Sequence, residues 1–320
     1  MSRNRTQGGE TSFGPVAAPY PAYRALAAAG ELRRRADRLL ESLQSCELCP
    51  RRCGTNRAAG EEGKCGVARR ALVSSWFPHH GEEFCLRGYR GSGTIFFAGC
   101  NLKCVFCQNY ELSWHLAGDP MGPEELARAM LDLQRRGCHN INFVTPSHVV
   151  AQIVEALAIA AEEGLQIPIV YNTSAYDSVE TLRLLEGVVD IYMPDLKFGD
   201  SRVAARYTAV ADYWEVATAA VREMHRQVGD LELTGEGLAR RGLLVRHLIL
   251  PGGLAGSERV LRFLAEEISP NTAVNLMTQY YPAAHAFRYP ELNRRISGGE
   301  YLAVRRLADQ LGLRRLEDMG

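Results

Sequence analysis

Seven of the nine cysteines in this chain fall into two short groups, and these groups are the residues best suited to chemistry. One group, with C-x3-C-x2-C spacing, consists of Cys100, Cys104 and Cys107. Three thiolates so close together can bind three corners of a cubane iron–sulfur cluster, which leaves one iron open to another ligand. Catalytic zinc with three protein ligands is the competing interpretation, whereas a structural zinc would require a fourth ligand.

The other group lies nearer the amino terminus and has C-x2-C-x3-C-x11-C spacing; its members are Cys46, Cys49, Cys53 and Cys65. Four thiolates suit either a structural zinc or a second [4Fe–4S] cluster that relays electrons to the first, and the spacing does not choose between them. The surrounding segment, residues 46–89, is poor in apolar residues. We therefore expect a bound metal to organise it.

The elements that must position these groups follow from the apolar pattern. From residue 94 onward, short apolar runs alternate with stretches of helical periodicity, which predicts βαβ units and a parallel sheet. Six units rather than eight predict an α/β fold with a partial (β/α)6 TIM-like barrel and an N-terminal cysteine-rich extension, with an open doubly wound sheet as the alternative. The predicted strands are 94–98, 140–144, 167–171, 188–193, 243–250 and 273–277, and the predicted helices include 23–43, 123–136 and 149–163.

We expect three regions along the chain. Residues 1–20 form a flexible tail, residues 21–90 a helix followed by the cysteine-rich metal-binding extension, and residues 91–320 the barrel. In parallel α/β folds the chemistry gathers at the carboxyl ends of the strands. Polar or ionisable residues follow the predicted strands, and the candidates are Thr145, Ser147, Asn172, Thr173, Asp195, Lys197 and Gln279.

Arg246 differs from these candidates because it lies inside the fifth predicted strand. A buried charge there must reach a strand end or find a partner. Binding of a cofactor or substrate carboxylate and a structural salt bridge are equally good interpretations.

The loop from Gly99 to Asn109 resembles the signature of the radical S-adenosylmethionine (SAM) superfamily, which carries C-x3-C-x2-C after the first strand of a partial barrel. The resemblance implies that Cys100, Cys104 and Cys107 bind a [4Fe–4S] cluster and that Phe106 lies near the adenine of SAM. It also implies the chemistry: the open iron chelates SAM, and one-electron reduction yields a 5′-deoxyadenosyl radical that abstracts hydrogen from a substrate. A flavodoxin- or ferredoxin-like electron donor is implied as a partner.

Residues 93–100, 140–148 and 246–252 resemble the branch that contains pyruvate formate-lyase activating enzyme, within an activase-like subfamily of unassigned substrate. Activating enzymes line the cofactor pocket with Asp-Thr-Asn and Asp-Leu-Lys runs, which appear here at residues 172–174 and 195–197. The resemblance therefore implies that Lys197 contacts the cofactor carboxylate and that Gln279 lies near the adenine. The Gly-Gly-Glu run of the activating enzymes is replaced by residues 145–148, Thr-Pro-Ser-His.

The resemblance favours activation of a glycyl-radical enzyme, with radical modification of a peptide or small metabolite as the alternative. A non-catalytic zinc-binding interaction protein is the rival from another class.

The composition limits the class of protein: 46% hydrophobic and 23% charged residues are typical of globular proteins and exclude disordered and collagen-like chains. Thirty-seven basic residues balance thirty-seven acidic ones, so the chain has no net positive charge to attract the phosphates of a nucleic acid, and we expect no nucleic-acid partner.

The chain has no apolar run long enough for a membrane span and no signal-peptide core near its start. The odd number of cysteines argues for metal-bound thiolates rather than disulfides. We therefore expect a protein of the reducing cytoplasm.

Overall fold

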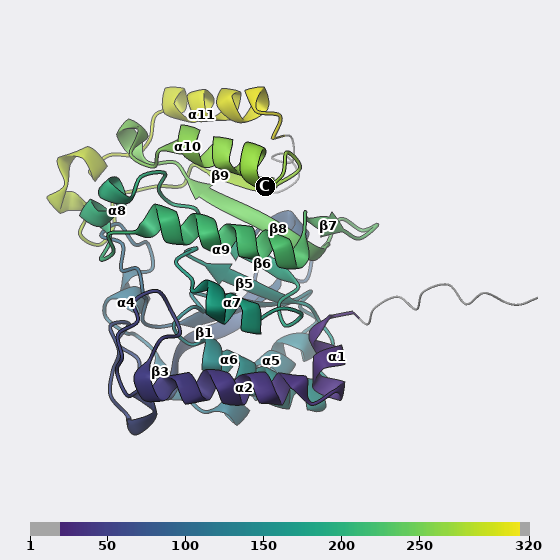
Figure 1. The fold of residues 1–320 in the computed structure, drawn as a ribbon. Coiled ribbons are helices and arrows are strands. Elements are labelled where there is room, and N and C mark those ends of the chain that lie inside the picture. The colour runs from purple at the N-terminus through teal and green to yellow at the C-terminus, as the bar shows by residue number, and fades with distance from the viewer. Residues whose placement is uncertain (1–19, 314–320) are drawn as a thin grey trace, which may run out of the picture.

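The computed structural model describes residues 20–313, so the predicted tail lies outside the described residues apart from Tyr20. Figure 1 shows helices covering a central sheet. That sheet has nine strands and is mixed. Within residues 20–313 no helix is long and apolar enough to cross a membrane.

Six parallel strands form the main part of the sheet, and all six predicted strands are confirmed, with ends shifted by a few residues. Each pairs in parallel with the next, and the sheet does not close into a barrel because the last strand pairs only with its predecessor. The strands are β2 (Ser92–Phe97), β4 (Ile141–Val144), β5 (Ile169–Thr173), β6 (Ile191–Pro194), β8 (Ala239–Leu248) and β9 (Ala273–Met277).

The cysteine-rich extension contributes its own edge to this sheet. Strand β1 (Ala71–His79) pairs antiparallel with β2, and β3 (Asp119–Met121) pairs antiparallel with β1. The short helix α3 (Phe84–Arg87) then places Cys85 and Leu86 in a buried apolar cluster with residues of β5, β6, β8 and β9. The extension is therefore anchored by apolar contacts as well as by whatever its cysteines bind.

Helices cover the outer face of the sheet. Predicted helices 123–136 and 149–163 are confirmed as α5 (Pro123–Arg135) and α6 (Val150–Glu162). The predicted helix 23–43 is wrong as a single element: it is α1 (Tyr23–Ala28) and α2 (Glu31–Glu41), separated at Gly30, whose φ of 67° ends a helix. Helix α2 packs against α6, which in turn packs against α5; the three helices lie at the bottom of the view in Figure 1.

The remaining elements are short or peripheral. The α-helices are α4 (Tyr110–Ser113), α7 (Val179–Leu184), α8 (Ser201–Tyr207), α9 (Tyr213–Val228), α10 (Ser257–Arg262) and α11 (Gly298–Gln310). The remaining strand is β7 (Glu232–Leu233). Short 3-10 turns span residues 42–45, 57–59, 251–253, 286–288 and 290–292, and a π-helical turn spans residues 263–268.

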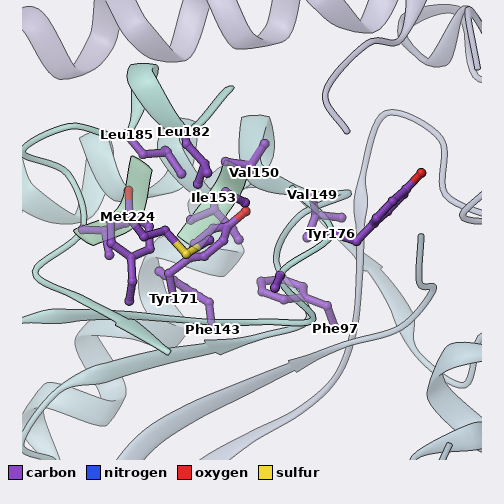
Figure 2. Packing of buried hydrophobic residues seen from close by; sticks show 14 of the residues in the cluster. Phe97, Phe143, Val149, Val150, Ile153, Tyr171, Tyr176, Leu182, Leu185 and Met224 are labelled. Carbon is purple, nitrogen blue, oxygen red and sulfur yellow. The ribbon is translucent and has the colours of Figure 1, made fainter. Parts of the chain in front are cut away.

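The main core lies between the sheet and its helices. Figure 2 shows Phe97, Phe143 and Tyr171, from three neighbouring strands, pointing toward Ile153 of α6 and Met224 of α9. Because successive side chains of a strand face opposite sides, the residues next to these point to the inner face. That inner face is where the candidate site lies.

Candidate active site

A cavity of about 560 Å³ opens at the carboxyl ends of the parallel strands. All six strands or the loops that follow them contribute to its walls, and all three cysteines of the Cys100 group line it. Eight of the nine predicted cofactor-binding residues also line it: Phe106, Thr145, Asn172, Thr173, Asp195, Lys197, Arg246 and Gln279. The ninth, Ser147, is buried behind the wall.

The cysteine loop is shaped by close backbone contacts. Gly99 has a φ of 85°, and a side chain there would start 2.8 Å from the carbonyl oxygen of Cys65, so only glycine fits. The backbone N–H groups of Leu102 and Lys103 point at the Cys100 sulfur, with N···S distances of 3.3 and 3.5 Å. Such N–H groups stabilise a thiolate, which is the form that binds metal.

Two of the three thiols in this loop are buried. Burial raises the pKa of Cys100, although the N–H of Lys103 opposes it, and burial likewise raises the pKa of Cys104 against the effect of Lys197. Binding of a metal by these two thiols therefore requires release of their protons.

Asp195 and Lys197 form an ion pair on the wall of the cavity. Burial alone would lower the pKa of Lys197, but Asp195 and Cys104 raise it further than burial lowers it, so the lysine stays charged. Lys197 bonds one oxygen of Asp195, whereas the other oxygen, Oδ1, is buried without a hydrogen-bond partner. The hydroxyl of Ser174, also on the wall, is buried and unpartnered as well. A bound group with hydrogen-bond donors would satisfy both.

Asp177, which the sequence analysis missed, organises the neighbouring part of the wall, at the end of β5. Its carboxylate accepts hydrogen bonds from Tyr171 (3.1 Å) and Thr173 (2.5 Å), and Ser147 is bonded to Thr173 at 2.9 Å. Burial raises the pKa of Asp177, and the hydroxyls around it oppose that rise. Ser147 and Asp177 thus position the side chain of Thr173 from behind the wall. The sequence did not reveal this role of Asp177, because it lies in the loop after β5, where no periodic pattern predicts which side chains point toward the site.

Arg246 is held by the extension. Its guanidinium contacts Glu82 and donates to Glu83 with an Nε···Oε1 distance of 2.7 Å, and Asn275 donates to the same oxygen of Glu83 at 2.7 Å. The two carboxylates outweigh burial and raise the pKa of Arg246. The salt-bridge interpretation of Arg246 therefore describes the structure, although this side chain also lines the cavity.

Sequence analysis also missed Glu82, Glu83 and the adjacent His79 as residues of the cavity wall. They lie beyond the predicted strands, in a segment read as loop. No distinctive signal marks them in the sequence, because Glu61 and Glu62 form a second adjacent glutamate pair in the same segment.

Two histidines near the site are structural. His247 is bonded through both ring nitrogens, to the Leu196 carbonyl at 2.7 Å and the Ser257 hydroxyl at 2.8 Å. His148 bonds the carbonyl of Ala98 at 2.9 Å. Burial lowers the pKa of each to about 4, so both rings are neutral near pH 7 and hold loop backbones in place.

The amino-terminal cysteines come together beside the cavity but do not line it. Cys46, Cys49 and Cys65 are buried, and Cys53 is half-buried. Across residues 20–313, no group of three or more His, Cys, Asp or Glu side chains is spaced to hold a single metal ion. In a cubane cluster each thiolate binds a different iron, so the sulfur ligands stand farther apart than around one ion.

Comparison with known proteins shows to which family the chain belongs. A sequence model of the radical SAM superfamily matches residues 94–235. The chain is also 33% identical over 280 residues to MJ0674 of Methanocaldococcus jannaschii, described as uncharacterized, a match that spans 84% of this chain and 76% of that protein. The chain belongs to the radical SAM superfamily.

Three solved structures resemble this radical SAM protein. A radical SAM methyltransferase from Sphaerobacter thermophilus is 16% identical, with 90% of this chain and 89% of that chain covered and a TM-score of 0.48. Native anSMEcpe with bound AdoMet is 10% identical, with 67% and 57% covered and a TM-score of 0.46. SuiB of Streptococcus suis, bound to precursor peptide SuiA, is 14% identical, with 66% and 43% covered and a TM-score of 0.44.

Membership of the radical SAM superfamily implies a [4Fe–4S] cluster and SAM. The residues present fit both groups. The three thiols of the Cys100 group lie on one wall, and the unpartnered oxygen of Asp195 lies beside the charged Lys197. An amino-acid moiety needs one acceptor for its ammonium and one cation for its carboxylate, and this pair offers both.

Proposed function

We propose that this radical SAM enzyme cleaves SAM reductively at a [4Fe–4S] cluster bound by Cys100, Cys104 and Cys107, and abstracts hydrogen from a protein or peptide substrate. One observation carries the proposal: a single cavity joins the three thiols to an aspartate–lysine pair with an unpartnered buried oxygen. When bound, the cluster and SAM supply a 5′-deoxyadenosyl radical. We infer that the open array of six parallel strands is the partial barrel of this superfamily.

The chain's own residues bind and orient SAM. Asp195 accepts from the ammonium of SAM through Oδ1, and Lys197 donates to its carboxylate. Phe106, which packs edge-on against Phe198 and Tyr280 with ring centres 5.9 and 6.0 Å apart, presents an aromatic surface to the adenine. The buried residues Asn172 and Thr173, the half-buried Thr145 and the exposed Gln279 complete the pocket wall and help to exclude water from the reacting carbon.

The outer part of the cavity supports a macromolecular substrate. His79, Glu82 and Glu83 line that part, and the same segment exposes four large apolar side chains: Trp76, Phe77, Phe84 and Tyr89. Of these, Phe77 lies beside the cavity, because its ring stacks on Phe96 of the cavity wall with ring centres 5.5 Å apart. An exposed apolar residue next to a site supports docking of another protein there. A small metabolite would have no use for such a surface. Among protein substrates, the resemblance to activating enzymes favours a glycyl-radical enzyme.

The enzyme also needs a one-electron donor, and we propose a flavodoxin- or ferredoxin-like protein of the reducing cytoplasm.

The identity of the substrate is tested by EPR. The reconstituted enzyme, SAM and a reductant are mixed with a candidate glycyl-radical enzyme, and a glycyl-radical signal is expected. The matched control is the same partner with its radical glycine replaced by alanine.

A second variant tests the docking surface. Trp76→Ser with Phe77→Ser should weaken the yield of substrate radical while leaving SAM cleavage unchanged. Efficient reaction with a small metabolite, unaffected by these two substitutions, would contradict the protein-substrate proposal.

A further inference from the structure

Arg57 is buried in the extension without a carboxylate partner. Its side chain is only 1% exposed, and it donates to the carbonyl oxygens of Ala68 (3.1 and 3.2 Å) and His148 (2.8 Å). Its remaining partner is the sulfur of Cys46, 3.6 Å from Nη1. Among residues 20–313 it forms no ion pair. A buried cation without a counter-charge is strongly destabilising, so a negative charge must lie beside it.

The four amino-terminal cysteines are the groups that can supply this charge. Cys53 and Cys65 both lie close to Gly63, where a side chain would start 3.4 and 3.5 Å from their sulfurs. Gly63 therefore keeps the space between the two sulfurs open. Arg57 also acts electrostatically on Cys65, in addition to its contact with Cys46. Neutral thiols would leave the guanidinium uncompensated, whereas metal-bound thiolates give a centre with net negative charge.

This cysteine group touches the Cys100 loop on both sides of Cys100. Gly99 packs against the backbone of Cys65. Arg51, which lies between Cys49 and Cys53, donates to the carbonyl oxygen of Asn101 at 2.8 Å. A structural zinc has no need to lie against this loop, whereas a redox centre does.

We propose that Cys46, Cys49, Cys53 and Cys65 bind a second [4Fe–4S] cluster, that Arg57 balances its charge, and that Asn101 and Gly99 couple it to the Cys100 loop. The half-buried Cys53 faces outward and marks the side on which an electron donor approaches. A reduced flavodoxin or ferredoxin gives up one electron and is oxidised. A cluster held by Cys46, Cys49, Cys53 and Cys65 would take up that electron on going from the 2+ to the 1+ state and would return to 2+ on passing it inward; no bond forms or breaks.

Metal content tests the site independently of SAM chemistry. In the triple variant Cys100→Ala, Cys104→Ala, Cys107→Ala, only the amino-terminal group can bind metal. After anaerobic reconstitution we expect about four irons and about four inorganic sulfides per chain, with a [4Fe–4S] Mössbauer spectrum. One zinc and no sulfide would overturn the proposal. The coupling to the Cys100 loop rests on the proposed function, but this measurement does not, so the two can fail separately.

Redox titration in the same triple variant tests Arg57. Arg57→Met removes the cation at similar length, and Arg57→Lys keeps it. Loss of the cation should disfavour the reduced cluster by at least tenfold, a fall in midpoint potential of about 59 mV or more. Cluster loading by the Arg57→Lys variant but not by the Arg57→Met variant would support the same conclusion. Equal behaviour of the two variants would overturn the role of Arg57.

EPR of the intact enzyme tests the coupling. With both clusters reduced, we expect a spectrum broadened or split by magnetic interaction between them. The reference is the sum of the triple-variant spectrum and that of a variant in which Cys46, Cys49, Cys53 and Cys65 are all replaced by alanine, so that only the Cys100 group can bind a cluster. A wild-type spectrum equal to that sum would overturn the coupling through Asn101 and Gly99.

Discussion

Lys197 donates a hydrogen bond to Asp195 at the carboxyl end of β6, with 2.5 Å between Nζ and Oδ2, and both side chains face the Cys100 loop. The pair is thus preassembled beside the proposed cluster. It also leaves one buried oxygen of Asp195 without a partner. A zwitterionic ligand would complete the pair on both sides, which makes these two residues the clearest test of SAM binding.

Replacing Lys197 should weaken SAM binding without loss of the cluster. Lys197→Met keeps the length and removes the charge-assisted hydrogen bond, which contributes on the order of 1.5–3 kcal/mol, or roughly ten- to hundredfold in affinity. Calorimetry or the shift of the reduced cluster's EPR signal on SAM addition measures this. Arg202→Met, which removes an exposed cation on α8, is the control. Unchanged affinity in the Lys197→Met variant would exclude Lys197 as the carboxylate anchor.

Arg246 should matter for stability more than for cofactor affinity. Arg246→Met leaves the buried carboxylates of Glu82 and Glu83 without their cation, which should cost about 3–5 kcal/mol of unfolding free energy. The pair of Arg202 and Asp200 is exposed to solvent, which screens the interaction of the two charges, so Arg202→Met again serves as control. Chemical unfolding measures both. A variant at Arg246 as stable as the control, but unable to bind SAM, would return the arginine to a cofactor-binding role.

Gly99 and Gly60 have similar backbone conformations, so substituting each by alanine distinguishes the effect of backbone strain from the effect of a steric contact. Gly99→Ala places a methyl 2.8 Å from the Cys65 carbonyl, whereas Gly60, with a similar φ of 94°, has nothing within 4 Å of the corresponding position. Both substitutions carry a left-handed penalty of about 1 kcal/mol. Only Gly99→Ala should lower the iron content of the Cys100 site. Equal iron in both variants would show that the loop tolerates displacement from Cys65.

The pH dependence of stability should carry a contribution from Asp190. Burial raises its pKa to about 6, against the N–H groups of Ile169 and Ala22. Because the folded state holds this proton more tightly than the unfolded state, stability falls as pH rises from about 4 to about 6. The loss is on the order of 2–3 kcal/mol.

Asp190→Asn removes this titration. Unfolding free energies of the wild type and the variant, measured across that range, should therefore differ by an amount that changes with pH. A constant difference would show that Asp190 titrates normally.

The sequence predicts the six parallel strands because short, mostly apolar runs such as 140–144 and 273–277 alternate with stretches of helical periodicity. It also predicts the Cys100 group and the Asp195–Lys197 pair, since these follow strands directly. The contribution of the extension could not be predicted. Glu83 bonds to Arg246, which is 163 residues away in the sequence. Strand β1 was also missed, because it lies in the segment that was interpreted as metal-organised on account of its cysteines. Such long-range pairings leave no local periodicity.

The most direct test of the account is formation of 5′-deoxyadenosine from SAM. Anaerobically reconstituted enzyme with dithionite should release 5′-deoxyadenosine and methionine, detected by chromatography, whereas Cys104→Ala should release none. Cys138→Ala, which removes a buried cysteine outside both groups, should retain the activity. Failure of the wild type to cleave SAM with its cluster intact, or cleavage by the Cys104→Ala variant, would contradict the account.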